Sequence, residues 1–130
     1  MKFPADCGYT KEHEWVRVQD GVAIVGITEY AQKELGDVVF VELPKVGDTF
    51  DTNETFANVE SVKAVSEVFS PVAGEVLEVN QELVDSPQLV NDDPYGDGWF
   101  IKLKVADAEE LKDLLNSDEY AEFVAEESAE

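Results

Sequence analysis

The chain has 130 residues, of which 30 are acidic and 9 are basic, so its formal net charge is −21 at pH 7. A field of that sign repels nucleic-acid phosphates and anionic lipid headgroups, and no apolar run is long enough to span a bilayer, so neither nucleic acid nor a membrane is an expected partner. The single cysteine, Cys7, excludes an internal disulfide and a multi-cysteine metal site.

The length and the absence of a low-complexity linker predict a single domain over residues 1–130. We expect a β-rich core at about 9–105 and a helical C-terminal segment at about 107–126. Residues 1–15 contain neither the apolar stretch of a secretory signal nor an Arg- and Ser-rich amphipathic presequence. The expected location is therefore the cytoplasm, or the mitochondrial matrix if a transit peptide was removed.

Short runs of β-branched and aromatic residues alternate with turn-forming residues along most of the chain. Strands are expected at 22–27, 38–43 and 99–105, and in the last run apolar residues alternate with Lys102 and Lys104. Turn signals such as Asp20-Gly21 separate these runs. Short strands at this spacing are typical of a small β-sandwich or barrel.

Two stretches have helical patterns instead. Thr28 is a suitable N-cap for a helix of about two turns that stops at Gly36. Asp107 and Glu110 have the spacing of a capping box, and apolar stripes follow them. We expect residues 125–130 to be frayed.

Residues 83–98 show neither a helix nor a strand pattern and contain two prolines and two glycines. A loop of this length in a compact domain is usually functional or itself compactly folded.

Residues 56–70 predict a β-hairpin with an unusual turn. The arms are expected at 56–60 and 64–69, with Ser61, Val62 and Lys63 between them. A tight hairpin turn normally uses Gly, Asn or Asp at positive φ, and a β-branched valine is unfavourable there. Local rules that fail tend to mark functional sites, and a lysine at the tip would be accessible for attachment of a swinging arm. The alternative is one continuous strand with a solvent-facing lysine.

Three short blocks lie in and after this hairpin, Glu-Ser-Val-Lys-Ala (60–64), Ser-Pro-Val-Ala-Gly (70–74) and Glu-Val-Asn (78–80). Together they resemble the lipoyl-attachment signature of the glycine cleavage H protein family. Further blocks agree in the same order, at residues 9–16, 25–32, 35–44 and 91–99. The resemblance extends from about Tyr9 to Val124, nearly the whole chain, and this ordered set of blocks is highly specific.

The resemblance implies a mostly β fold, a lipoyl-type hybrid of barrel and sandwich made of two small antiparallel sheets. A short helix near 28–35 and the C-terminal helical segment would complete it. The resemblance also implies that Lys63 carries lipoate as N6-lipoyllysine. Glu60, Ser61, Val62 and Ala64 would then be the context that a lipoate-attaching enzyme recognises.

The family further implies a monomeric carrier without catalytic activity of its own. Its arm takes an aminomethyl group from a pyridoxal-phosphate-dependent glycine decarboxylase to a folate-dependent aminomethyltransferase. The reduced dithiol then goes to an FAD-containing dihydrolipoamide dehydrogenase. An alternative that needs the same hairpin is a lipoyl relay, which donates lipoate to other 2-oxo acid dehydrogenase complexes.

Other swinging-arm domains fit the sequence less well. Methionine typically flanks the lysine of a biotinyl carrier on both sides, and aspartate typically precedes the lysine in lipoyl domains of 2-oxo acid dehydrogenases. Here Val62 and Ala64 flank Lys63. An acidic interaction module without a cofactor, a different class of protein, is disfavoured by the full set of motifs.

The chemistry of the loaded arm predicts an acidic cleft. A neutral aminomethyl nitrogen on sulfur can expel the thiolate, whereas a protonated nitrogen cannot. Carboxylates stabilise the ammonium form, and exclusion of water assists them. The candidates are Glu12 and Glu14, which share a face if their segment is a strand, and Glu67 on the second hairpin arm. A solvated surface is the alternative for all three.

His13 is the only histidine of the chain. One isolated histidine makes neither a metal site nor a catalytic triad. We expect it to be a hydrogen-bonded surface or core residue, and we expect no metal site.

Overall fold

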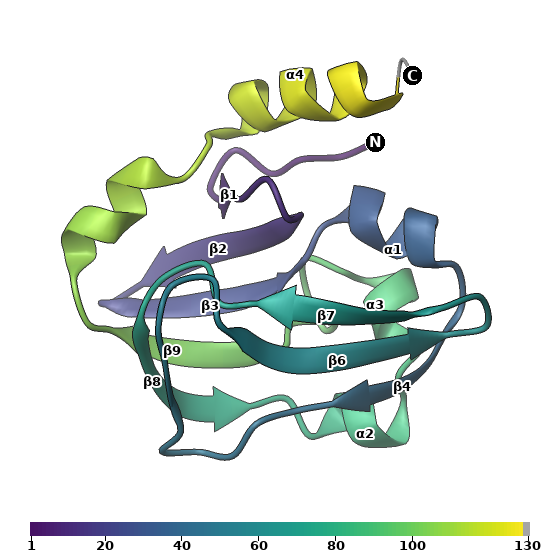
Figure 1. The fold of residues 1–130 in the computed structure, drawn as a ribbon, viewed down its shortest axis with the longest axis horizontal. Coiled ribbons are helices and arrows are strands. Elements are labelled where there is room, and N and C mark those ends of the chain that lie inside the picture. The colour runs from purple at the N-terminus through teal and green to yellow at the C-terminus, as the bar shows by residue number, and fades with distance from the viewer. Residues whose placement is uncertain (129–130) are drawn as a thin grey trace.

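The computed structural model describes residues 1–128 as two antiparallel sheets with short helices around them (Figure 1). The larger sheet has the strand order β1-β2-β3-β9-β8-β5, and the smaller sheet has the order β4-β6-β7. Both strand orders have two ends, so neither sheet closes into a barrel. The strands are β1 (Gly8–Tyr9), β2 (Glu14–Gln19), β3 (Val22–Ile27), β4 (Val38–Glu42), β5 (Thr49–Phe50), β6 (Thr55–Ser61), β7 (Val65–Phe69), β8 (Gly74–Val79) and β9 (Ile101–Val105).

The helices lie outside the sheets. They are α1 (Glu29–Leu35), α2 (Glu82–Asp85), α3 (Leu89–Asp92), the 3-10 helix η1 (Ala108–Asp113) and α4 (Ser117–Ser128). In Figure 1, α4 lies above the N-terminal stretch and β1, away from the smaller sheet. No helix within residues 1–128 is long and apolar enough to cross a membrane.

The sheets share one apolar core. Val25, Ile101 and Leu103 from the larger sheet and Val41 and Val59 from the smaller sheet are all buried in it. Fully burying an aliphatic side chain contributes about 1.5–3 kcal/mol, so the two sheets stabilise each other's position. A second cluster beneath α4 contains Cys7, Tyr9, Trp15, Tyr120 and Val124.

The predicted first helix is confirmed together with both of its end signals. The Thr28 side chain accepts a hydrogen bond from the Ala31 backbone N–H, and the Gly36 N–H donates to the Gln32 carbonyl. Gly36 has a φ of 81°, a conformation that glycine adopts without strain. The expected strands at 22–27 and 38–43 are confirmed as well, the second ending one residue early at Glu42.

The prediction of a featureless loop at 83–98 is wrong in part, because this stretch contains most of α2 and all of α3. Periodicity does not reveal helices of one turn. Leu83 and Val90 are buried, and the Asn91 amide donates to the Gln32 side chain and the Gly36 carbonyl, both at 2.8 Å. The segment is thus compactly folded, and it supports the end of α1.

Three details of the other predicted elements are corrected. β9 begins at Ile101, so Trp99 precedes the strand. Glu110 does not close a capping box, because its carboxylate accepts from the Ala73 N–H and the Thr52 hydroxyl. α4 continues through Ser128, so residues 125–128 are helical where fraying was expected, and residues 129–130 lie outside the described residues.

Candidate functional site

The hairpin forms as predicted, and Lys63 lies at its tip. β6 and β7 pair antiparallel with Glu60 opposite Val65, which excludes the alternative of one continuous strand. The tip then consists of Val62, Lys63 and Ala64. Val62 is 67% exposed, and its backbone N–H donates to the Asp37 carbonyl at 3.0 Å, which holds the tip against the end of α1.

Ser61 explains why this turn needs no glycine. Its hydroxyl oxygen accepts from the N–H groups of Lys63 and Ala64, both at 3.1 Å, and its own N–H donates to the Ala64 carbonyl at 2.8 Å. A serine side chain that bonds the backbone ahead of it is a known alternative to a purely backbone turn. Neither Val62 nor Lys63 has positive φ, so a β-branched residue is accommodated without strain.

The Lys63 side chain is exposed and lies beside the end of α1. A Cβ atom added to Gly36 would lie 3.0 Å from Cε of Lys63. Among residues 1–128, no carboxylate lies within ion-pair distance of its ammonium group. The amine is therefore accessible for acylation.

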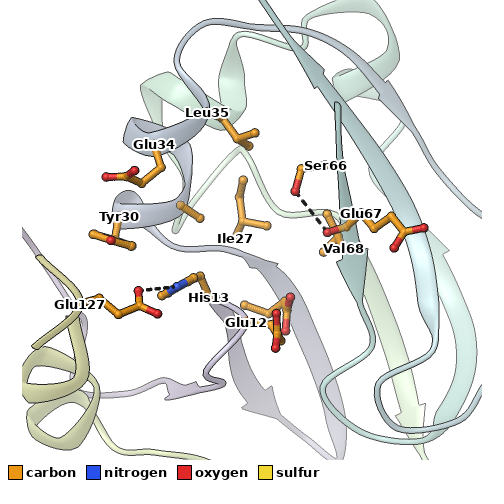
Figure 2. A pocket seen from close by; sticks show the side chains of 12 residues that line it. Glu12, His13, Ile27, Tyr30, Glu34, Leu35, Ser66, Glu67, Val68 and Glu127 are labelled. Carbon is orange, nitrogen blue, oxygen red and sulfur yellow. Dashed lines mark hydrogen bonds and ion pairs between the residues drawn. The ribbon is translucent and has the colours of Figure 1, made fainter. Parts of the chain in front are cut away.

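A cleft of about 310 Å³ opens between α1, β7 and the start of β2 (Figure 2). Its apolar lining consists of Ile27, Ala31, Leu35 and Val68. Its polar lining consists of Glu12, His13, Glu14, Tyr30, Glu34, Ser66, Glu67 and Glu127. All three acidic residues predicted from the sequence contribute atoms to the lining of this one cleft, which also contains two acidic residues that the sequence did not indicate, Glu34 and Glu127.

Glu14 is the deepest of these carboxylates and is only 2% exposed. Its oxygens accept from the Thr10 hydroxyl at 2.6 Å and from the Phe69 N–H at 3.4 Å. Burial raises the pKa of Glu14 to about 7, and the nearby charge of Glu12 adds to the rise, while the two hydrogen bonds oppose it. A buried carboxyl group whose ionised form is disfavoured is thus present in the cleft, and a cation beside it would favour ionisation.

Glu12 and Glu67 differ from Glu14 in position. Glu12 lies in the turn before β2 rather than on a strand, so the premise that it shares a strand face with Glu14 is wrong, although both line the cleft. Figure 2 shows the Glu67 carboxylate directed away from the cleft, because alternate residues of β7 face opposite ways. Ser66, which the sequence did not single out, points into the cleft (Figure 2).

His13 is hydrogen-bonded, as expected, and forms part of the cleft lining. Its Nδ1 lies 2.8 Å from the Tyr120 hydroxyl and its Nε2 lies 3.1 Å from the Glu127 carboxylate. No group of three metal-ligating side chains occurs within the described chain. Glu127 could not be found from sequence spacing, because it lies 114 positions after His13, the difference between their numbers.

Comparisons with known proteins identify the family of the chain. The family model described as glycine cleavage H-protein matches residues 7–127. The chain is 57% identical over 126 residues to the glycine cleavage system H protein of Halothermothrix orenii, covering 97% of this chain and 98% of that protein. The chain belongs to the glycine cleavage H protein family.

Two further relatives support the same assignment. The glycine cleavage system H protein of Bacteroides thetaiotaomicron is 53% identical, covering 95% of this chain and 98% of that protein. The crystal structure of the H protein from Mycobacterium marinum superposes with a TM-score of 0.85 at 41% identity, covering 92% of this chain and 97% of that one. Family and fold are therefore confirmed, and the chain is a lipoyl carrier of the glycine cleavage system.

The raised pKa of Glu14 predicts a specific pH dependence of folding. Because the folded chain favours the protonated carboxyl, the stability that this group contributes is fully present below about pH 4.5 and is lost as the pH rises to about 7. The loss is on the order of 3 kcal/mol. Glutamine does not titrate, so Glu14→Gln should gain stability relative to the wild type by that amount between pH 4.5 and pH 8.

Urea unfolding of both proteins across this pH range measures the difference. All other titrating groups are shared, so they cancel in it. A difference that stays constant with pH would contradict the assignment.

Proposed function

We propose that Lys63 carries lipoate in amide linkage and that the chain shuttles an aminomethyl group between enzymes of the glycine cleavage system. The observation that carries this proposal is the accessible Lys63 amine on a hairpin beside a cleft that contains a buried carboxylate. The bound lipoyl group would supply the dithiolane that accepts the aminomethyl group and is later left as a dithiol. Glycine decarboxylase, the aminomethyltransferase and dihydrolipoamide dehydrogenase are the proposed partners, and the chain itself catalyses none of these steps.

The residues of the cleft fit a mixed apolar and cationic cargo. Ile27, Leu35 and Val68 offer an apolar wall to a hydrocarbon arm. Glu14 and Glu12 offer carboxylates to a terminal ammonium group, which stays protonated beside them. Ser66 adds a hydroxyl that can hydrogen-bond to the same group (Figure 2).

Lipoylation of Lys63 requires an enzyme that recognises the tip of the hairpin. Glu60, Ser61, Val62 and Ala64 surround the lysine, and Ser61 fixes the turn. Val65 is 68% exposed, and Phe40 on β4 is paired beside Glu60. We propose this surface as the recognition context of the lipoate-attaching enzyme, in a cytoplasmic setting.

Replacing Lys63 tests the attachment site. Lys63→Arg should fold as the wild type does, because an exposed side chain at a turn changes stability by less than about 0.5 kcal/mol. Incubation with a lipoate ligase should add the mass of one lipoyl group to the wild type and nothing to the variant. A mass gain in Lys63→Arg would assign the modification to another lysine, and no gain in the wild type would refute the carrier proposal.

Moving the lysine by one position tests recognition of the turn. The double variant Val62→Lys, Lys63→Val keeps the composition but changes the direction in which the amine points. It should be modified at least tenfold more slowly than the wild type under the same ligase conditions, by the order of magnitude of a lost specific contact. Equal rates would show that the ligase does not read the position of lysine in the turn.

Single neutralisations in the cleft test the storage of the cargo. Wild type, Glu12→Gln, Glu14→Gln and Glu67→Gln would be lipoylated, loaded with the methylamine adduct and followed by formaldehyde release. A partly buried charge-assisted hydrogen bond contributes roughly 1.5–3 kcal/mol, so Glu14→Gln should shorten the half-life tenfold or more. Glu67→Gln serves as the matched control, because its carboxylate points out of the cleft (Figure 2). Equal half-lives in all four proteins would show that the cleft carboxylates do not stabilise the adduct and that the chain only holds the arm.

A further inference from the structure

The C-terminal helix α4 packs on the second apolar cluster with only part of its surface. Within it only Tyr120 and Val124 are buried. It has five carboxylates, no basic residue, and two of the acids, Glu126 and Glu127, in its last turn. Negative charge at a helix C-terminus opposes the helix dipole, whereas a reciprocal capping box between Asn116 and Glu119 stabilises the first turn. The position of α4 therefore rests on the apolar cluster around Tyr120 and on specific bonds made toward its C-terminal end.

A chain of hydrogen bonds supplies those bonds. The Glu127 carboxylate accepts, so Nε2 of His13 donates to it, and in the tautomer with a proton on Nε2 alone the Nδ1 accepts from the Tyr120 hydroxyl. The Tyr120 oxygen lies 2.7 Å from Oγ1 of Thr28 and can accept from it. Oγ1 of Thr28 in turn accepts from the Ala31 N–H at the start of α1. Each hydroxyl therefore donates once and accepts once along this chain.

The backbone of His13 is positioned for this role. Its φ is 73°, a left-handed conformation that few side chains favour, and its carbonyl accepts from the Thr28 N–H at 3.1 Å. The ring lies 4.8 Å from Tyr30 and 5.8 Å from Phe123, between α1 and α4. Figure 2 shows His13 between the Glu127 side chain and the interior of the cleft.

We propose that α4 lines the arm cleft reversibly and can undock from the rest of the domain. His13 and Tyr120 are the positioning residues that hold it in the docked state. Docking of α4 sets how long a cationic cargo is retained in the cleft. α4 contributes Glu127 to the cleft, and the same hydrogen bonds reach the N-cap of α1, which lines the cleft on the same side, across from β7 (Figure 2). The inference rests on the proposed function, since the cargo is the one assigned above. By linkage, a cargo that binds better when α4 is docked must also stabilise the docked helix.

The fastening itself can be tested on the unmodified protein. Hydrogen exchange of the α4 amides would be compared in wild type, His13→Asn, Tyr120→Phe and Glu127→Gln. Asparagine tolerates the left-handed backbone, and phenylalanine retains the ring that stacks on Tyr9 at 4.7 Å, so neither change should disturb the fold. Glu126→Gln is the matched control, because it removes the same charge from the same turn at an exposed position outside the cleft.

We expect exchange in α4 to accelerate roughly fivefold in His13→Asn and Tyr120→Phe, as the loss of one net hydrogen bond gives, while the strands remain unchanged. Glu127→Gln should accelerate exchange more than Glu126→Gln does. Equal exchange in the variants and the control would overturn the fastening role, whether or not the chain is lipoylated.

The coupling to cargo needs the lipoylated protein. Loading with the methylamine adduct should slow α4 exchange relative to the oxidised lipoyl form, and formaldehyde release should be several-fold faster in Tyr120→Phe than in Glu126→Gln. If release is cleft-dependent but identical in these two variants, α4 is not a wall of the cleft and the proposal fails while the carrier function stands. If no variant accepts lipoate, the intact mass shows the failure of lipoylation by itself. Hydrogen exchange of the unmodified protein still decides whether His13 and Tyr120 hold α4 in place.

Discussion

The carboxylate of Glu14 is buried where the two sheets meet. Glu14 begins β2 in the larger sheet, and the Phe69 N–H that it binds ends β7 in the smaller sheet. A buried charge costs free energy unless it is paired, so the chain keeps this group either protonated or hydrogen-bonded. The same bond connects the two sheets on the side of the cleft, in addition to their shared apolar core. A cation that entered the cleft beside Glu14 would favour the ionised form of this carboxyl group.

The hairpin and α1 define the other end of the site. The Ser61 hydroxyl closes the turn, and the Asp37 carbonyl accepts a hydrogen bond from the backbone of its tip. Gly36 has no side chain, which leaves room for the methylene groups of Lys63. The Asn91 amide ties the end of α1 to α3, and its carbonyl oxygen accepts from the Val38 N–H at the start of β4. Lys63 and the cleft therefore belong to one connected framework, and an arm attached at Lys63, as proposed above, would start from a fixed position relative to the cleft walls. A flexible loop would give no such repeatability.

The sequence predicts well whatever depends on short-range chemistry. Thr28 and Gly36 marked both ends of α1, and the run from Phe56 to Ser70 located the hairpin, because capping and alternation act between near neighbours. It failed for α2 and α3, since one-turn helices show no period, and for β1 and β5, which have two residues each. Glu12 lies on the cleft because of the turn before β2. This turn includes the left-handed backbone conformation of His13, which the sequence alone does not show. Ser66 and Glu127 were missed because tertiary pairing, rather than sequence distance, brings them to the site.

The large negative charge of the chain and the acidity of the cleft act over different ranges. At physiological ionic strength, charges on the surface are screened over about 8 Å, so the field of the 30 acidic groups would favour encounters with partners that have basic patches, without holding a particular cargo. Glu14 is shielded from solvent ions by burial, whereas Glu12 and Glu127 line the same cleft from exposed positions. An ammonium group beside Glu14 would interact with a charge at short range in a medium of lower dielectric constant than water, where the Coulomb energy is larger. Adding salt should therefore weaken the association with partners at a lower concentration than it shortens the lifetime of the cargo in the cleft. If the lifetime of the cargo fell in parallel with partner binding, the ammonium group would have to lie on the surface.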